Sequence, residues 1–152
     1  QSESLILKDK LCPVYYKKDL RDGGYIGSTI INFDDTRRIA KVVKDQKTRE
    51  IKIPDGIQDE LSMIYLLRTK DVRVGEEYEF PALIGTKTFN VEVTVLRSEK
   101  IKTIFGNTDT LVVKSSPREV TLWITDDESR IPVRLEVNTK LGKLVAELRN
   151  II

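Results

Sequence analysis

The segment 55–68 most constrains the fold, because its apolar residues repeat with helical spacing in a chain that otherwise follows strand patterns. Asp55 is placed to cap this helix, and Pro54 just before it ends the preceding strand. At about 100° per residue, the apolar side chains fall on two faces. One face holds Ile57, Leu61, Ile64 and Tyr65, and a neighbouring, partly opposite face holds Met63, Leu66 and Leu67. The sequence therefore predicts one helix over about residues 56–68 that is covered on two sides.

Most of the remaining chain alternates apolar and polar residues with the period of a β-strand. Val91, Val93 and Val95, for example, alternate with polar neighbours. Turn sequences such as 22–24 and 140–142 separate these segments, and short connections favour antiparallel pairing of roughly nine to ten strands. A sheet with one apolar face must curl or stack to bury that face. We therefore expect a mainly β fold, with a curved antiparallel sheet or open half-barrel wrapped round the apolar helix.

Composition limits the function classes. At 152 residues the chain is long enough for a single domain, taken as residues 1–152, and too short for two comfortable ones. Its 26 basic and 24 acidic residues are interleaved and give a net charge of +2, so we expect no nucleic-acid partner. Histidine is absent and Cys12 is the single cysteine, which removes the usual general base and most zinc ligands. We expect no metal, no cofactor and, because the longest apolar run is 63–67, no transmembrane segment.

Six stretches in a fixed order carry a resemblance to a known family. They are residues 11–16, 22–25, 59–69, 74–78, 101–110 and 122–133. Together they extend over nearly the whole chain. In these stretches the sequence resembles the bacterial domain of unknown function family numbered 3108, whose members are secreted or envelope proteins.

The resemblance implies a location in the periplasm or cell envelope, and the family has no established activity. A curved sheet with an apolar helix is similar in fold to the periplasmic lipoprotein-carrier half-barrels, which hold acyl chains. Longer relatives carry further strands before the point that matches Leu11. We therefore expect the sheet to end at an incomplete N-terminal edge, near residues 4–7 or 11–18. A homodimer or a strand-donating protein partner is expected to complete it there.

Two acidic clusters have alternative interpretations. Asp126, Asp127 and Glu128 are the densest cluster, and carboxylates suit calcium. The three residues are consecutive, however, and lack the alternating spacing of a calcium loop, so a solvated hairpin turn is favoured. Asp59 and Glu60 stand near the start of the predicted helix. An acid/base pair would need a further partner in a cleft, and none is evident, so the favoured interpretation is that these acidic side chains suit the positive end of the helix dipole.

Candidate ligand contacts come from the helix and from one later hairpin. They are Met63, Leu66, Leu67, Arg68, Trp123 and Arg130. An arginine at the rim of an apolar pocket holds a lipid phosphate or carboxylate through a bidentate bond. For Arg68 and Arg130 the favoured alternative is a salt bridge to a nearby aspartate or, for Arg68, capping of the helix carbonyls. Trp123 is expected in the core, with its ring against the helix.

Three classes of function are compatible with these patterns. A non-catalytic envelope protein that binds an apolar, acyl-chain-like ligand or a protein partner in a concave face explains a helix that is apolar on two sides. A structural or assembly module with a filled core explains the same surfaces and associates through exposed sheet edges. An enzyme ranks third, because no convergent polar cluster is visible and histidine is absent. The sequence thus predicts a binding protein rather than an enzyme.

Overall fold

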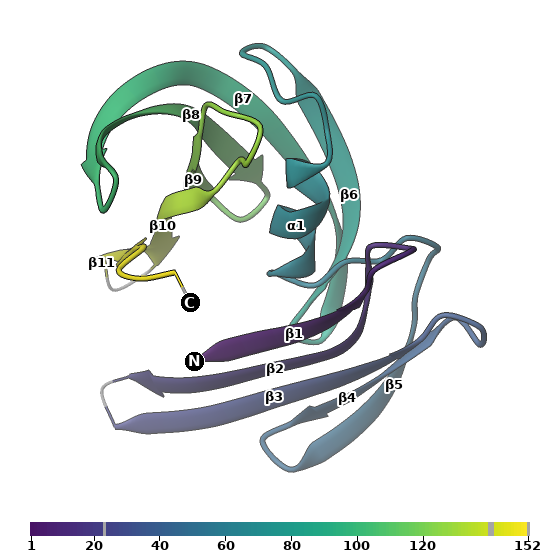
Figure 1. The fold of residues 1–152 in the computed structure, drawn as a ribbon. Coiled ribbons are helices and arrows are strands. Elements are labelled where there is room, and N and C mark those ends of the chain that lie inside the picture. Colours follow the sequence, from purple (N-terminus) through teal and green to yellow (C-terminus); the bar gives the residue numbers. More distant parts are fainter. Residues whose placement is uncertain (23, 140–141, 152) are drawn as a thin grey trace. The chain divides into compact units, whose positions relative to one another are not determined.

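The computed structural model describes residues 1–22, 24–139 and 142–151. Among these residues, eleven β-strands form two antiparallel sheets and seven residues form one α-helix (Figure 1). The elements are β1 (Ser2–Leu7), β2 (Cys12–Asp22), β3 (Tyr25–Asp34), β4 (Ile39–Lys44), β5 (Lys47–Lys52), α1 (Ser62–Arg68), β6 (Glu77–Ile84), β7 (Lys87–Thr103), β8 (Gly106–Ser116), β9 (Val120–Thr125), β10 (Pro132–Thr139) and β11 (Gly142–Glu147). One sheet has the order β1-β2-β3-β4-β5, and the other has the order β11-β10-β9-β8-β7-β6.

These two sheets confirm the predicted mainly β, antiparallel fold with one helix. The predicted turns at 22–24 and 140–142 fall between β2 and β3 and between β10 and β11. Gly23, Lys140 and Leu141 of these turns lie outside the described residues. The half-barrel wrapped round the helix and the single domain stay predictions. In the described part of the chain, no helix is long and apolar enough to cross a membrane.

The chain divides into two compact units, and the N-terminal unit consists of residues 1–67 and 80–90. This unit contains the five-stranded sheet, whose strands pair in chain order. Alternation brings the apolar side chains of neighbouring strands together, with Ile31 opposite Val42 and Phe33 opposite Ala40. The buried core of the unit is Tyr16, Ile31, Phe33, Ala40, Val42, Ile53, Ile57 and Leu83, against which Ile51 and Leu61 pack.

The helix α1 begins at Ser62, later than the predicted residue 56. The cause is Gln58, whose backbone forms a bridge to β6. Its N–H donates to the carbonyl of Pro81 at 2.8 Å, and its carbonyl accepts the N–H of Leu83 at 2.8 Å. Backbone groups that are used in this bridge are not available for helical hydrogen bonds. The prediction of the helix start was therefore wrong, because a non-local contact replaced the first turn.

Asp59 caps α1 in place of the predicted Asp55. Its Oδ1 accepts the N–H groups of Leu61 and Ser62 at 2.7 and 2.8 Å. The Oγ of Ser62 in turn accepts the N–H of Asp59 at 2.8 Å, which makes a reciprocal cap. Tyr65, predicted on the buried face, is 54% exposed. The predicted helical face that included Ile57 and Tyr65 is wrong, because Ile57 reaches the core from the extended segment before α1.

The start of α1 is held on the sheet by polar side chains of the N-terminal unit. Ser4 on β1 donates its hydroxyl to Asp59 Oδ2 at 2.6 Å. Tyr16 and Lys18 on β2 both reach Glu60 Oε2, at 2.5 and 2.8 Å. Burial and the Glu60 carboxylate raise the pKa of the Tyr16 phenol, so Tyr16 remains a donor to Glu60 at neutral pH.

The C-terminal unit consists of residues 68–79 and 91–152. Its sheet is strongly curved, and Figure 1 shows β7 and β8 bending along their length. β7 is the longest strand, with 17 residues, and its pairing with β8 shifts register between Val95 and Arg97. Bulges of this kind bend a strand and increase its twist. The core of this unit includes Val112, Trp123 and Val133, against which Ile101, Ile131 and Leu148 pack.

Candidate ligand-binding groove

The C-terminal unit contains a groove with a volume of about 220 Å³. The groove lies where the far end of β7, the start of β10 and the segment after β11 come together. Its lining residues are Ile101, Lys102, Thr103, Ile104, Val133, Arg134, Glu147, Leu148 and Arg149. The volume is below the roughly 300–1,000 Å³ of a typical small-molecule pocket. The groove therefore suits a short segment or the end group of a larger ligand.

The floor of the groove is apolar, because its residues also belong to the buried cluster of this unit. Val133 is buried, and Ile101 and Leu148 pack on the same cluster as Trp123. The N–H of Leu148 donates to the carbonyl of Val133 at 2.9 Å, which extends the antiparallel pairing past the end of β11. The segment after β11 is thereby held along β10, where it forms one wall.

Arg134 lies over the ring of Trp123, with its guanidinium carbon 5.1 Å from the ring centroid. This is a cation–π contact. It depends on an irregularity in β10, because Ile124 pairs with Pro132 while Trp123 pairs with Arg134. One extra residue in β10 thus brings the arginine directly opposite the tryptophan, on the same face of the sheet.

Two buried donors near the groove lack a hydrogen-bond partner among the described residues. They are Nε1 of Trp123, a residue only 7% exposed, and Nε of Arg134. Buried polar groups are nearly always hydrogen-bonded, and an unpaired one costs about 1–3 kcal/mol. An acceptor oxygen, of a bound molecule or of water, satisfies such donors.

The charge around the groove is mainly positive. The charged residues in its lining are Lys102, Arg134, Arg149 and Glu147. Arg134 Nη2 lies 2.6 Å from Glu136 Oε1, and Arg134 Nη1 lies 4.0 Å from Glu147 Oε1. The ammonium of Lys143, 2.8 Å from Glu136 Oε2, holds the pKa of the Glu136 carboxyl below its usual range, and Arg134 adds to this effect. Three basic residues against one acidic residue favour an anionic group in the groove.

The predicted ligand contacts are divided between the two units. The N-terminal unit holds Met63, Leu66 and Leu67, and the C-terminal unit holds Arg68, Trp123 and Arg130. Leu67 is buried, and the other two helix residues are partly buried. Trp123 is buried as predicted and belongs to the cluster beneath the groove. The contact of its ring with the helix, and a ligand-binding role for the six residues, stay predictions.

Arg68 and Arg130 both interact with the turn between β9 and β10. Arg68 Nε and Nη2 donate to the carbonyl of Ser129 at 3.2 and 2.8 Å. Arg130 Nη1 lies 3.6 Å from Asp126 Oδ1. The favoured ion pair with an aspartate is therefore confirmed for Arg130, whereas Arg68 binds a backbone carbonyl of the same turn.

The acidic cluster 126–128 forms the predicted hairpin turn. Asp127 Oδ1 accepts the N–H groups of Ser129 and Arg130 at 2.8 and 3.2 Å and the hydroxyl of Thr125 at 2.9 Å. One carboxylate oxygen thus organises the whole turn. Among the described residues, no group of three or more histidine, cysteine or acidic side chains is arranged to hold a metal ion.

Sequence reasoning missed the three basic groove residues, Lys102, Arg134 and Arg149. A regular pairing of β9 with β10, extended from the turn without a bulge, places Trp123 opposite Val133. Arg134 then lies on the other face of the sheet from Trp123. Pro132 at the strand start is the one local signal of an irregularity, because proline cannot donate to a regular ladder. Nothing in the local sequence predicts that the far end of β7 lies beside the segment after β11.

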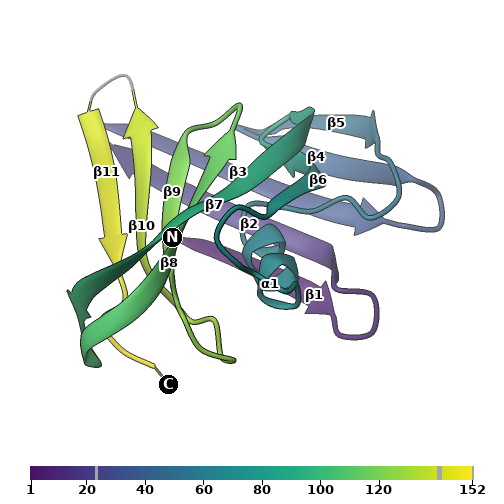
Figure 2. The same ribbon diagram turned by 90° about the horizontal axis from the view of Figure 1, so that it is seen from above.

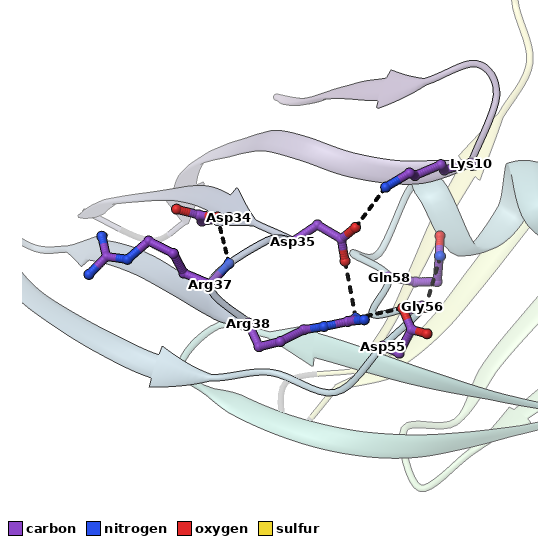
Figure 3. Close-up of polar contacts among 8 residues, drawn as sticks. All are labelled: Lys10, Asp34, Asp35, Arg37, Arg38, Asp55, Gly56 and Gln58. Carbon is purple, nitrogen blue, oxygen red and sulfur yellow. Dashed lines mark hydrogen bonds and ion pairs between the residues drawn. The ribbon is translucent and has the colours of Figure 1, made fainter.

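A second polar cluster, in the N-terminal unit, connects three turns (Figure 3). Lys10 pairs with Asp35 at 3.0 Å, and Arg38 pairs with Asp35 at 3.1 Å and with Asp55 at 2.5 Å. The Arg38 guanidinium holds the pKa of the Asp55 carboxyl below its usual range. These side chains are exposed, so solvent and salt screen their interactions. We interpret the cluster as a connection between loops rather than a binding site.

The sequence matches the model of one protein family. The family model described as "Protein of unknown function (DUF3108)" matches residues 1–149. No curated protein and no solved structure matches the sequence significantly. The matched range includes every groove residue and all of both units except residues 150–152. The chain therefore belongs to this family of proteins of unknown function.

Proposed function

We propose that this protein is a non-catalytic binding protein whose C-terminal groove holds the anionic end of an apolar, acyl-chain-like ligand. The observation that carries the proposal is the unpartnered Nε of Arg134, a lining residue of the groove, over the ring of Trp123, whose own Nε1 also lacks a partner among the described residues. Lys102 and Arg149 add positive charge at the rim. A carboxylate supplies the acceptor oxygens and the negative charge, and a short methylene segment fits the apolar floor.

The absence of catalysis is proposed from the chemistry of the groove residues. General acid–base catalysis needs a group whose pKa lies near the working pH. The titratable lining residues are one lysine, two arginines and one glutamate, and the chain has no histidine. The one lining glutamate, Glu147, lies 4.0 Å from Arg134 Nη1, a geometry that favours an ion pair.

The wider expectation of a half-barrel wrapped round α1 remains part of this proposal. Its support is the apolar character of Met63, Leu66 and Leu67 on a short helix. A fatty acid with a photoreactive group at its methyl end tests this role by cross-linking and mass spectrometry. Labelling confined to peptides outside 62–68 contradicts it.

A location in the cell envelope rests on the family resemblance, and fractionation of cells that produce the protein tests it.

Trp123, the single tryptophan, makes ligand binding directly measurable by its fluorescence. We expect linear alkyl carboxylates to change the emission in a saturable way, with affinity rising with chain length because more methylene groups are buried. Alkyl amines of equal length should bind much more weakly, because the groove is basic. Arg134→Gln should weaken carboxylate binding at least about tenfold, the effect of losing a charge-assisted hydrogen bond.

The matched control is Arg97→Gln. Arg97 is another arginine of the curved sheet, but it pairs with Glu99 at 2.7 Å and does not line the groove. This variant should bind carboxylates like the wild type. Equal responses to carboxylates and amines, or no change of emission with either, would contradict the proposal.

A second candidate function is an assembly module that associates through its sheet edges. The observation that favours it is that β1 is an edge strand with Leu5 and Leu7 exposed, as predicted for the N-terminal edge. Association at β1 stays a prediction. Light scattering of wild type and Leu5→Lys at equal concentration tests it, and an unchanged mass for the variant argues against this edge.

A further inference from the structure

The outer edge of the six-stranded sheet is an unprotected strand. β11 is the last strand in the order, and Figure 2 shows it beside β10 at the margin of the sheet. All six of its residues are exposed, including Leu144 at 59% and Val145 at 43%. An exposed edge with apolar side chains is a template for pairing with another strand.

Each of the other sheet edges in the described residues carries a feature that opposes pairing. The pairing of β1 with β2 shifts register between Leu5 and Ile6, where β2 has one extra residue, and the twist that such a bulge adds makes this edge less regular. β5 carries three basic residues among six. β6 contains Pro81, and the backbone of Gln58 already bonds to it. β11 has no proline and no register shift in its pairing with β10.

The backbone of β11 presents its free groups at alternate residues. The N–H of Leu148 donates to the carbonyl of Val133, so Leu148 faces β10. Inward and outward groups alternate along an antiparallel strand, and the register is continuous through β11. The N–H and carbonyl groups of Lys143, Val145 and Glu147 therefore point outward, away from β10.

We propose that β11 pairs antiparallel with β11 of a second copy of this chain, about a two-fold axis at Val145. In this register Val145 lies opposite the partner subunit's Val145. Lys143 lies opposite the partner subunit's Glu147, and the reverse ion pair forms by symmetry. Leu144 lies opposite the partner subunit's Ala146. Every outward backbone group of these residues then gains a partner, and each charge meets its opposite.

Other registers lose this complementarity. A shift of one residue pairs outward with inward backbone groups, which leaves both unbonded. A shift of two residues keeps the backbone bonds possible. It places Lys143 opposite either the partner subunit's Val145 or the partner subunit's Arg149, and both arrangements remove the ion pairs. The ion pairs between Lys143 and the partner subunit's Glu147 therefore favour the register centred on Val145.

The ion pairs of β10 and β11 extend the same pattern within one subunit. Lys143 Nζ lies 2.8 Å from Glu136 Oε2, and Arg134 Nη1 lies 4.0 Å from Glu147 Oε1. In the dimer each Lys143 lies between two carboxylates, and each Glu147 lies between two cations. The pairing joins two six-stranded sheets and involves no ligand. Glu147 belongs to both the edge and the groove lining, whereas Lys143 does not line the groove.

Two charge variants of the full chain test the register. Lys143→Glu places glutamates opposite each other across the axis, and Glu147→Lys places lysines opposite each other. Each variant alone should dimerise at least about tenfold more weakly than the wild type, because two repulsive pairs replace two attractive ones. An equimolar mixture restores both ion pairs, so a heterodimer should form. Light scattering and native mass spectrometry measure the masses, and circular dichroism checks that each variant is folded.

Val145→Pro tests the backbone pairing, because it removes an N–H that faces solvent in the monomer. It should abolish dimerisation, whereas Leu5→Lys on β1 should leave it unchanged. A wild type that stays monomeric at hundreds of micromolar overturns the proposal. So does a mixture of the folded charge variants that forms no heterodimer, or a dimer that Leu5→Lys disrupts and Val145→Pro does not.

Discussion

At the scale of single residues, Asp59 determines where the helix starts. Its carboxylate is fully buried and accepts hydrogen bonds from Ser4, Leu61 and Ser62. Burial raises the pKa of this carboxyl, although the three donors oppose the shift. The residue therefore stabilises the fold as a hydrogen-bond acceptor, while its negative charge has a desolvation cost.

Replacing Asp59 by asparagine separates these two effects. Asparagine keeps an acceptor oxygen for the helix cap and removes the charge. A folded-state pKa above the unfolded value of about 3.9 means that ionisation costs stability as pH rises through the folded-state pKa. The free energy of unfolding of Asp59→Asn minus that of the wild type should therefore increase from about pH 4 upward and then level off. Urea melts at a series of pH values measure it.

The control is Asp59→Ala, which loses the cap and should be destabilised by about 1–2 kcal/mol. A difference between Asp59→Asn and wild type that is constant with pH, or that decreases as pH rises, contradicts the buried-charge interpretation.

Asp127 and Asp126 are adjacent acidic residues with different roles. Asp127→Ala removes the acceptor of three hydrogen bonds and should lower the free energy of unfolding by about 1–2 kcal/mol. Asp126→Ala removes a 3.6 Å ion pair to the largely buried Arg130 side chain and should cost about 1 kcal/mol or less, which is below the loss for Asp127→Ala. Thermal melts should give the same midpoints with calcium and with a chelator. A midpoint that calcium raises by several degrees, and that Asp126→Asn no longer shows, would establish a metal site instead of a turn.

At the scale of elements, α1 depends on the segment before it as much as on its own residues. Seven residues are too few for an isolated helix to be stable in water. Ile57 in the preceding extended segment is buried, and Leu61 packs on the same core. The helix is therefore held by an anchor on the sheet, together with the polar contacts of Asp59 and Glu60.

Ile57→Ala should thus cost about 2–5 kcal/mol, because it leaves a cavity in the core of the N-terminal unit. Ile26→Ala is the matched control, since Ile26 is 76% exposed on β3. It should change the free energy of unfolding by less than about 0.5 kcal/mol. Similar losses for the two variants would show that Ile57 is not part of the core.

At the scale of the whole molecule, β6 and β7 each contribute residues to both compact units. A strand that is shared in this way gives the two units a common element of backbone. We therefore keep the prediction that residues 1–152 unfold as a single domain.

The single tryptophan gives a direct test of this cooperativity. Trp123 belongs to the C-terminal unit and Ile57 to the N-terminal unit. If unfolding is two-state, Ile57→Ala should lower the urea midpoint seen by Trp123 fluorescence as much as the midpoint seen by far-ultraviolet circular dichroism. A fluorescence midpoint that stays at the wild-type value would show two independently folding units.

The sequence by itself determined most of the strand segments, the presence of one helix and the acidic turn at 126–128. These features follow from local periodicity and turn chemistry, which act within a few residues. Val91, Val93 and Val95, for instance, are all buried on β7, as their alternation predicts. The deep burial of Trp123 also follows from its local apolar surroundings.

The tertiary structure alone decided three other features. Gln58 bonds to β6 rather than to the helix, the extra residue in β10 places Arg134 on Trp123, and β11 is left as a free edge. The backbone of Gln58 had two possible partners, one close in sequence and one distant, and the register of β10 and the edge position of β11 likewise depend on how separate segments pair. Local spacing describes only the close one, and the distant one is available only after the chain has folded. The helix start, the groove and the proposed dimer edge all depend on that choice.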